Sequence, residues 1–597
     1  MLDRVRRILV ASASSRKSIA VARSIVEVLR KPVVGVFHAP HPHRFSKVFS
    51  KRIALSGIDR RSDSWARIVA KIAKDLGCSV VVPIDFVDFE TFSRCVDLFD
   101  SLGIVLVSPP YQKLVEVSNK ARLPQLLQGV ADTPRQVVVE SIDDLDRVNY
   151  LEPPLVVKGL GDASNPKYFS DRSNALEEAR RRIPCIVQEY VAGIGRGYYA
   201  ACMDGEPLLE FTHERIVEYE PIGGPSLAAR GPVLDPKLFA LGRKIVAKLR
   251  WCGPIMVETK YVAHEDRYVV IEVNPKFWGS IDLPTSLGYY FAPILVVAFV
   301  EGIEVARRVA KSLRVRSGCY SWILDGLRYL VKDWRTWCRL VGLGSRCCKD
   351  LDLGDPVRCL VQIFYALKRF RRERCSWLRY VEDSYRETST TLQRLRVARQ
   401  GVGFVLDLDG TLIELAVDWR RVRREVVERF GMPRGSSLMG WMLRLKRRDP
   451  KLFEEVSKFV ERFELEAVER SRLLVEPRIF RKLLERCGGR VCIATKQSSI
   501  VAERVLQRLG VEGVPIATRD LYEPSKEVLY RACLEKLGTD RAIVLDDALD
   551  GIVAALRLGL VPIAVARHSY AAWRFRRLGV ATVLVDRLND FLEKLVS

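Results

Sequence analysis

Two aspartates separated by one residue stand at the end of an apolar run and could bind a metal ion. Asp407 and Asp409 follow the run 404–406 and precede Gly410. The run predicts a buried strand, and ligands of open α/β sheets lie outside the carboxyl ends of the strands. Carboxylates this close repel each other unless a cation compensates, as Mg²⁺ does when it binds carboxylate and phosphate oxygens. The alternative is a polar Asp-Gly turn after an edge strand.

Two later strand ends carry side chains of related chemistry. The run 490–494 ends on the hydroxyl of Thr495, and the run 542–545 ends on the paired acids Asp546 and Asp547. Together with the string Asp-Leu-Asp-Gly-Thr at 407–411, this order resembles the motifs of the haloacid dehalogenase (HAD) phosphatase superfamily.

The lysine that this resemblance requires is displaced. The family's usual string places lysine directly before a proline, but here Glu523 stands before Pro524, and Lys526 follows three residues after Glu523. Three residues are about one helical turn, so we assign the role to Lys526 and expect Glu523 to face away or to pair with a base. Arg519 is the other cation nearby. The alternative is that Lys526 is a surface helix residue and that the phosphatase is weak.

The resemblance implies a Mg²⁺-dependent phosphatase that works through an aspartyl phosphate. Asp407 would attack phosphorus, and Asp409 would protonate the leaving group and then activate water. Thr495 and Lys526 would hold phosphate oxygens. The implied metal ligands are Asp407, Asp409, Asp546 and Asp547. The helical pattern after Leu415 resembles the cap that closes over such sites, excludes water and sets substrate choice.

The first half of the chain carries a second group of oxygen ligands. Glu272 and Asn274 lie two residues apart on the predicted strand 268–275, so their side chains share one face. Glu258, on the preceding predicted strand, can meet them. Three oxygen ligands on one patch suit Mg²⁺ bound to the phosphates of a nucleotide. A Glu-x-Asn string by itself more often marks a polar strand end.

The full order of polar residues in this half resembles the ATP-grasp superfamily of carboxylate ligases. The resemblance spans residues 1 to about 305, and the strings at 218–226 and 274–280 look like the branch that includes carbamoyl-phosphate-synthase-type ligases. One departure is Lys276, where the family commonly has arginine after Asn-Pro. Lysine cannot bind an acyl phosphate bidentately as arginine does.

This second resemblance implies a role for each matched residue. Lys120 and Lys158 would hold the ATP phosphates. The side chain of Gln188 would face the adenine, while backbone groups of Glu189 and Val191 would bond its edge. Arg215 would meet the transferred phosphate. Magnesium ions would be held by Glu258, Glu272 and Asn274.

Four segments follow from these motifs and from the apolar runs. Alternating strands and helices over 1–117 predict a Rossmann-like domain, which lacks the Gly-x-Gly-x-x-Gly string of dinucleotide sites. The ATP-grasp domain would follow over 118–305, a helical connector over 306–400, and the HAD-like phosphatase domain over 401–597, with its cap at about 415–477. The expected fold class is therefore a multidomain α/β protein: a Rossmann-like pre-ATP-grasp domain, an ATP-grasp fold, a helical connector and a HAD Rossmannoid domain with a helical cap.

Composition bounds the class of protein. The net charge of +24 could suit nucleic acid, an anionic membrane or phosphorylated substrates, but solvated faces of Arg-rich helices explain much of it. The longest apolar run, residues 289–300, is shorter than the roughly 18 residues that span a bilayer. Fourteen cysteines without a Cys-x-x-Cys pair favour reduced thiols. We expect a cytoplasmic protein without a signal peptide.

The sequence thus predicts a fusion of an ATP-dependent ligase and a phosphatase. ATP and Mg²⁺ (or Mn²⁺) would be the cofactors, with small carboxylates and phosphate esters as substrates. We expect no membrane or nucleic-acid partner, and a homodimer stays open. One alternative is a nucleic-acid-binding protein whose phosphatase trims ends, which Arg and Lys gathered beside Asp407 would favour. Another is a regulatory protein whose first half binds ATP without turnover, and the complete set Glu258, Glu272 and Asn274 argues against it.

Overall fold

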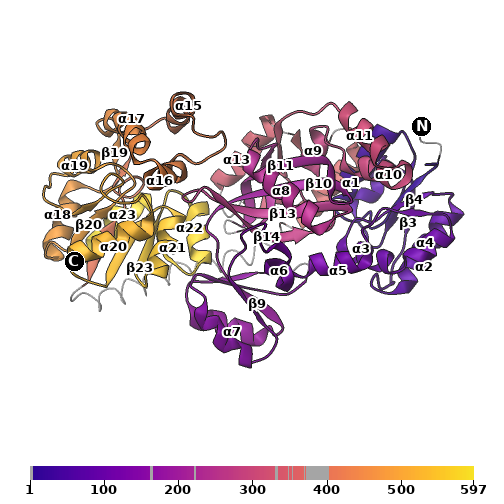
Figure 1. Ribbon diagram of the computed structural model, residues 1–597, viewed down its shortest axis with the longest axis horizontal. Coiled ribbons are helices and arrows are strands. Elements are labelled where there is room, and N and C mark those ends of the chain that lie inside the picture. The colour runs from indigo at the N-terminus through magenta and orange to yellow at the C-terminus, as the bar shows by residue number, and fades with distance from the viewer. Residues whose placement is uncertain are drawn as a thin grey trace.

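The chain folds into four main sheets and one two-stranded ribbon, counted over the residues that the structure describes. The computed structural model describes residues 4–161, 166–220, 223–329, 334–346, 348–352, 354–368, 370 and 402–596. Figure 1 shows the N-terminal sheet at one end of the molecule, the C-terminal sheet at the other, and the longest strands between them. The predicted mixed α/β architecture with parallel sheets is confirmed.

The N-terminal sheet is parallel throughout, with the order β3-β2-β1-β4-β5. Its strands are β1 Ile8–Val10, β2 Val33–Phe37, β3 Phe49–Ala54, β4 Val80–Val82 and β5 Val105–Leu106. Its helices are α1 Ser18–Leu29, α2 Asp63–Asp75, α3 Phe86–Arg94, α4 Val96–Ser101 and α5 Tyr111–Ser118. The strand order reverses between β1 and β4, so the loop after β1 lies where open α/β sheets bind ligands.

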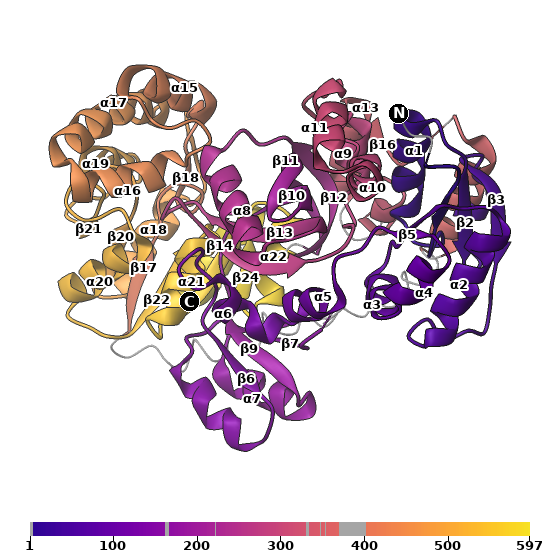
Figure 2. The same ribbon diagram turned by 45° about the vertical axis from the view of Figure 1, so that its right-hand side comes forward.

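A small antiparallel sheet, in the order β6-β9-β7-β8, forms a separate lobe with helix α7 (Figure 2). Its elements are β6 Gln136–Val139, β7 Leu155–Lys158, β8 Lys167–Phe169, α7 Arg172–Arg181 and β9 Cys185–Glu189. Short helices α6 Leu123–Leu127 and η2 Lys120–Arg122 precede it. Strand β7 pairs antiparallel with β9, so Lys158 at the end of β7 lies opposite Ile186 near the start of β9.

A seven-stranded sheet, in the order β14-β13-β10-β11-β12-β15-β16, forms the centre. Its long antiparallel strands are β10 Ile194–Met203, β11 Glu206–Glu220, β12 Gly223–Gly231, β13 Gly253–Val262 and β14 Arg267–Asn274. The helices of this part are α8 Pro236–Leu249, α9 Asp282–Ser286, α10 Phe291–Glu301 and α11 Ile303–Ser312. Most of the longest apolar run of the sequence forms α10, whose first eight residues are all buried. No described helix is long and apolar enough to cross a membrane.

The connector differs from the helical segment that we predicted. Strand β15 (Gly318–Ser321) pairs antiparallel with β12, and β16 (Cys348–Lys349) pairs parallel with β15, so both extend the central sheet beyond residue 305. Helix α13 (Trp334–Arg346) packs on them. The pairing of β12 with β15 joins residues about 90 positions apart, which no local pattern of apolar residues reveals. The rest of the predicted connector, residues 371–400, lies outside the described residues.

The C-terminal sheet is again parallel, with the order β21-β20-β17-β22-β23-β24. Its strands are β17 Gly403–Leu406, β20 Val491–Ala494, β21 Ile516–Ala517, β22 Ala542–Asp546, β23 Val561–Ala566 and β24 Ala581–Leu584. Its helices are α18 Pro477–Arg486, α19 Ser499–Arg508, α20 Lys526–Leu537, α21 Leu549–Arg557, α22 Ser569–Arg577 and α23 Leu588–Val596. Strands β17, β20 and β22 are buried along their whole length, as expected when helices cover both faces of a parallel sheet.

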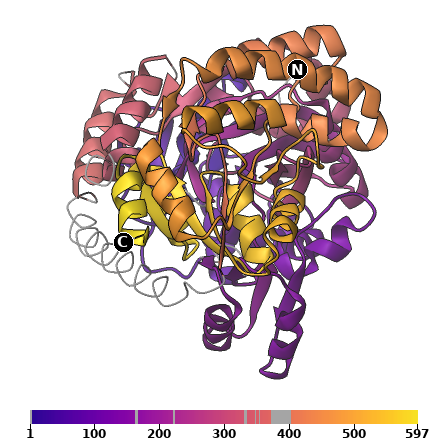
Figure 3. The ribbon, with the colours of Figure 1, turned by 90° about the vertical axis from the view of Figure 1, so that its left-hand side faces the viewer.

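Three helices form a separate layer above this sheet (Figure 3). They are α15 Trp419–Phe430, α16 Leu438–Arg448 and α17 Pro450–Val468. The short strands β18 (Ile413–Glu414) and β19 (Arg472–Leu473) pair at the two ends of this insertion. The layer has its own core of buried apolar side chains, including Val426, Met442 and Phe459. We call these three helices the cap.

Among the described residues, the state of one cysteine differs from the reduced thiols that the sequence favours. Cys319, on β15, is disulfide-bonded. Buried cysteines in the sheets, such as Cys202 and Cys492, are free thiols.

Candidate functional site

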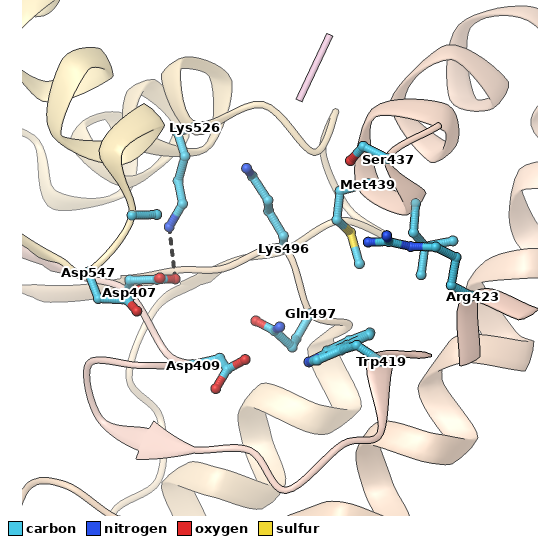
Figure 4. Close-up of a pocket in the computed structure, with 12 residues that line it drawn as sticks. Asp407, Asp409, Trp419, Arg423, Ser437, Met439, Lys496, Gln497, Lys526 and Asp547 are labelled. Atoms are coloured by element: carbon cyan, nitrogen blue, oxygen red, sulfur yellow. Dashed lines mark ion pairs between the residues drawn. The ribbon is translucent and has the colours of Figure 1, made fainter. Parts of the chain in front are cut away.

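The C-terminal candidate site is built around a buried lysine between two aspartates. The ammonium nitrogen of Lys526 lies 2.8 Å from Asp407 (Figure 4). It lies 2.6 Å from Asp546. Asp407 follows β17 and Asp546 ends β22, which are neighbours in the sheet. Lys526 begins helix α20. Burial lowers the pKa of Lys526, but the two carboxylates outweigh burial and the net shift is upward. The lysine is therefore a fixed positive charge.

Three carboxylates at the same sheet edge fit a divalent cation. Asp407, Asp546 and Asp547 each offer an oxygen atom, and these atoms lie within 4.8 Å of one another. Burial and the two neighbouring carboxylates raise the pKa of Asp547 to about 8. Burial also raises the pKa of Asp407, although Lys526 opposes it. Carboxylate oxygens are the ligands that Mg²⁺ prefers, and a cation would relieve the repulsion that raises these pKa values.

Asp409, which we predicted among the metal ligands, lies outside this group of three carboxylates. It lines the same cavity, and its carboxylate accepts a hydrogen bond of 3.0 Å from the backbone N–H of Leu415. Burial raises its pKa, so the carboxyl group holds a proton to higher pH than an exposed aspartate does. That property suits a group that donates and accepts protons.

The cavity above Asp407 has a volume of about 260 Å³ and lies between the sheet edge and the cap. Figure 4 shows Trp419 and Arg423 of the cap facing the aspartates across it. Lys496 and Gln497 line it from the loop after β20. Our reading of the sequence missed these four residues. Lys496 and Gln497 could have been found because they directly follow a strand end, but no signal marks the cap residues.

Thr495 lies beside this cavity rather than on its wall. Its side chain is fully buried, and its hydroxyl contacts the side-chain oxygen of Gln497. Lys496 instead forms an ion pair of 2.5 Å with Asp550. Lys496 is therefore a second cation at the place where we expected the hydroxyl of Thr495.

The residues near the displaced lysine have separate partners. Glu523 pairs with Arg447 of α16, with 3.0 Å between the arginine Nε and a carboxylate oxygen. Arg519 is fully buried and pairs at 2.8 Å with Glu464 of α17, which is also fully buried. Lys526 is thus the cation of this loop that reaches Asp407.

The first half of the chain holds a second candidate site. The pairing of β13 with β14 places Glu258 opposite Glu272 and Met256 opposite Asn274. Lys120 lies 3.4 Å from Glu272, and its ammonium donates to the carbonyl of Gly161 at 2.7 Å. Lys120, Met256, Glu258, Glu272 and Asn274 line a cavity of about 470 Å³.

Lys158 enters this cavity from strand β7 of the small lobe. Burial lowers its pKa to about 8, with Glu272 opposing the shift and Lys120 adding to it. An anionic phosphate group in the cavity would stabilise the charged form of the lysine.

Arg215 joins the acids of this site. It lies 2.8 Å from Glu258 and 3.1 Å from Glu218. Burial lowers its pKa, but the two glutamates outweigh burial and raise it, so the guanidinium stays charged. Glu218, which the prediction did not include, also lies 3.8 Å from Lys260. The acids that could hold Mg²⁺ are thus paired with cations that could hold phosphate.

The prediction puts the adenine against the side chain of Gln188 and the backbone of Glu189 and Val191. Gln188 and Val191 line this cavity, and the buried side-chain oxygen of Gln188 has no hydrogen-bond partner among the described residues. Such an orphan acceptor suits a ligand that donates a hydrogen bond. The side chain of Glu189 turns the other way, pairing at 2.5 Å with Arg135 and accepting from the backbone N–H of Glu152.

A third cavity, of about 810 Å³, adjoins the second. Arg16 and Pro225 line both cavities. Arg16 lies in the loop after β1, where the order of the N-terminal sheet reverses. It pairs at 2.5 Å with Asp325 and lies 4.8 Å from the ring centre of Trp322. The prediction missed Arg16, although its place after the first strand was a signal.

No family model and no curated protein sequence matches the chain. Among solved structures, it is similar over 53% of its length to a pyruvate carboxylase from Rhizobium etli, at 16% identity and a TM-score of 0.41, and covers 29% of that protein. It is similar over 57% of its length to an N5-carboxyaminoimidazole ribonucleotide synthetase solved as an ADP complex, at 15% identity and a TM-score of 0.43, and covers 87% of it. It is similar over 53% of its length to a phosphoribosylglycinamide synthetase from Anaerococcus prevotii, at 15% identity and a TM-score of 0.40, and covers 80% of that protein. Likenesses this weak do not decide the function of the chain.

Proposed function

We propose that the chain is a bifunctional enzyme, an ATP-grasp ligase joined to a HAD-type phosphatase. The supporting observation is that each half brings clustered carboxylates and a buried lysine together in a cavity of its own. In the first half these are Glu258 and Glu272 with Lys120. In the second half they are the three carboxylates at the edge of the C-terminal sheet with Lys526.

In the phosphatase half, Asp407 attacks the phosphorus of a phosphate ester. The bond from phosphorus to the ester oxygen breaks, and Asp409 donates its proton to that oxygen. Water then attacks the phosphorus of the aspartyl phosphate while Asp409 takes its proton, which releases phosphate and restores Asp407. Lys526 and Lys496 hold the anionic oxygens. A Mg²⁺ ion at the three carboxylates would add positive charge where negative charge develops.

In the ligase half, the terminal phosphate of ATP is transferred to a carboxylate. ADP leaves, an amine or similar nucleophile attacks the acyl phosphate, and phosphate departs. No side chain needs to act as a nucleophile, because positioning and charge neutralisation supply the rate. Lys120 and Lys158 bind phosphate oxygens, and Arg215 meets the transferred group. Glu258, Glu272 and Asn274 provide the oxygen ligands for Mg²⁺.

The third cavity is the candidate site for the carboxylate. Arg16 reaches both this cavity and the nucleotide cavity, so a carboxylate bound to it would lie beside the transferred phosphate. Arg23 and Arg358 line the same cavity, but each pairs with two acids, Asp352 and Asp355. Arg16 pairs with one acid, Asp325, which a bound carboxylate would replace or share.

The nucleic-acid alternative predicts arginines free to contact phosphates beside Asp407. Two arginines of cap helix α16 are instead paired with acids. Arg444 pairs with Asp266, and Arg447 pairs with Glu523. Paired arginines offer little charge to a nucleic-acid backbone, so this alternative is the weaker one.

Two assays test the proposal. With Mg²⁺ and a panel of carboxylates that includes the common amino acids, ATP turnover should release ADP. Release of AMP and pyrophosphate would contradict the ligase. With p-nitrophenyl phosphate and Mg²⁺, the protein should release phosphate through a hydroxylamine-sensitive intermediate on Asp407, and hydrolysis without that intermediate would contradict the phosphatase mechanism.

A further inference from the structure

We propose that Tyr261, on strand β13 of the ligase half, positions the wall of the phosphatase cavity that the cap supplies. The inference rests on the proposed phosphatase. It makes Tyr261 a positioning residue, because its side chain does not line the cavity and acts through Ser437, the residue before cap helix α16. Ser437 lines the cavity that contains Asp407 and Lys526 (Figure 4).

The contact between the two halves is a hydrogen bond to the start of a cap helix. The backbone N–H of Ser437 donates to the hydroxyl oxygen of Tyr261 at 2.8 Å. Ser437 is the residue before α16, and its own hydroxyl accepts from the N–H of Gly440. The first N–H groups of a helix have no partner within the helix, so Tyr261 supplies one of the missing acceptors from the other half of the chain.

The direction of this hydrogen bond is fixed by Asp266. The Tyr261 hydroxyl donates to the carboxylate of Asp266, which leaves its oxygen lone pairs to accept from Ser437. Asp266 also pairs with Lys237 at 2.7 Å and with Arg444 of the cap. Burial raises the pKa of Asp266, but these three donors outweigh burial and lower it, so the carboxylate stays charged. Tyr261 and Asp266 are both buried, and water does not compete for the pair.

A glycine lets helix α16 approach the turn between β13 and β14. A Cβ atom on Gly440 would lie 2.1 Å from the carbonyl oxygen of Ala263 and 3.0 Å from the backbone nitrogen of Asp266. Real Cβ atoms do not come so close to a carbonyl oxygen, so any larger residue at this position must move the helix. The wall formed by Ser437 would move with it.

The other end of α16 is tied to the loop that leads to the catalytic lysine. Lys446 donates to the carbonyl oxygens of Asp520 at 2.9 Å and Tyr522 at 2.6 Å. Helix α16 is therefore held by the ligase half at its first residues and by the phosphatase sheet domain at its last turn. Its position relative to Asp407 depends on both attachments, so the phosphatase cavity is completed by the ligase half.

The test uses three full-length variants. Tyr261→Phe removes the acceptor of the Ser437 N–H, and Gly440→Ala displaces the helix. Tyr268→Phe is the matched control, because Tyr268 faces Tyr261 across the same hairpin and its hydroxyl donates to Asp235 rather than accepting from Ser437. Hydrogen–deuterium exchange of the peptide that contains residues 437–440 measures positioning without any substrate. Hydrolysis of naphthyl phosphate and of acetyl phosphate measures the catalytic consequence.

We expect faster exchange of this peptide in Tyr261→Phe and Gly440→Ala than in the wild type and in Tyr268→Phe. Tyr261→Phe removes one hydrogen bond of ordinary strength, so we expect its kcat/KM for naphthyl phosphate to fall by about two- to tenfold. The fall should come from KM, because the wall contacts the organic group. Acetyl phosphate, which is too small to reach the wall, should be hydrolysed at the wild-type rate, and binding of ADP should not change.

Three results would overturn the inference. Equal exchange in all four proteins would show that Tyr261 does not hold the cap. Faster exchange with unchanged kinetics on naphthyl phosphate would show that the wall does not contact the substrate. If the wild type hydrolysed neither phosphate ester, the proposed phosphatase would fail, and with it the catalytic part of this inference, whereas the exchange data would still report the contact itself.

Discussion

The ammonium of Lys526 lies 2.8 Å from the carboxylate of Asp407, although the lysine stands three residues beyond the place where the family resemblance puts it. Helix α20 begins at Lys526, and this start turns the side chain toward the sheet edge. Glu523 occupies the usual position of the lysine and pairs with Arg447 instead. A cation can thus reach the same point in space from a different position in the sequence.

This geometry predicts that Lys526→Ala lowers the phosphatase kcat by about 10² or more, the usual scale for the loss of one preorganised charge partner. Glu523→Ala should change kcat little. Lys536→Ala is a matched control on the same helix, because Lys536 is exposed. The measurement is steady-state hydrolysis of p-nitrophenyl phosphate at saturating Mg²⁺, with circular dichroism to verify folding. A wild-type kcat in Lys526→Ala would require another cation beside Asp407.

Asp409→Asn should separate the two chemical steps. The p-nitrophenolate leaving group needs little help from an acid, so Asp407 should still become phosphorylated, but water would then lack its base. We expect the aspartyl phosphate to accumulate and multiple turnover to fall by about 10² or more, within the range for removal of a general base. Mass spectrometry of the acid-quenched protein reports the phosphorylated peptide. Rapid turnover without accumulation would assign the base to another residue.

A site residue could be predicted from the sequence where it ends or directly follows a strand that the sequence also predicts. Asp407, Asp546 and Asp547 directly follow or end strands of one sheet, so their meeting could be expected. The contributions of Trp419 and Arg423 could not, because both lie on a cap helix that packs on the site through non-local contacts. The strands β15 and β16 were missed for the same reason: they are short, and only the partner strand β12 stabilises them as strands.

A buried ion pair should stabilise the attachment of the cap. Arg519 and Glu464 are both fully buried, and Glu464→Gln would leave the guanidinium without its charge partner. Breaking such a pair costs about 3–5 kcal/mol, so we expect a clear fall in the midpoint of thermal unfolding of the C-terminal half. Glu466→Gln, two residues further along the same helix and exposed, should have little effect. Differential scanning calorimetry makes the comparison, and equal midpoints for the two variants would contradict the prediction.

Asp350 predicts a pH dependence of stability. Burial and the nearby Asp325 raise its pKa to about 7, while backbone N–H groups of Ile323 and Leu324, each at 3.0 Å, oppose the shift. In the unfolded chain the pKa would be about 3.9. Between these values the folded state binds more protons than the unfolded state, so this contribution to stability is complete below about pH 4 and is lost as the pH rises through 7.

The comparison is between the wild type and Asp350→Asn, which does not titrate. The wild type should lose stability relative to the variant as the pH rises from about 4 to about 7. Thermal unfolding across this range measures the difference in midpoint. A constant difference would show that Asp350 is ionised in the folded protein throughout.

The central claim is that the chain contains two separate sites, and one pair of substitutions measured in two assays tests it. Glu272→Gln removes a carboxylate opposite Glu258, and Asp407→Asn removes the proposed nucleophile of the other site. The assays are titration with Mg²⁺-ATP by calorimetry and hydrolysis of p-nitrophenyl phosphate, on the same full-length preparations. We predict that Glu272→Gln weakens nucleotide binding and keeps the phosphatase rate, whereas Asp407→Asn abolishes hydrolysis and keeps nucleotide binding. Loss of both properties in either variant, with the protein still folded, would contradict the account.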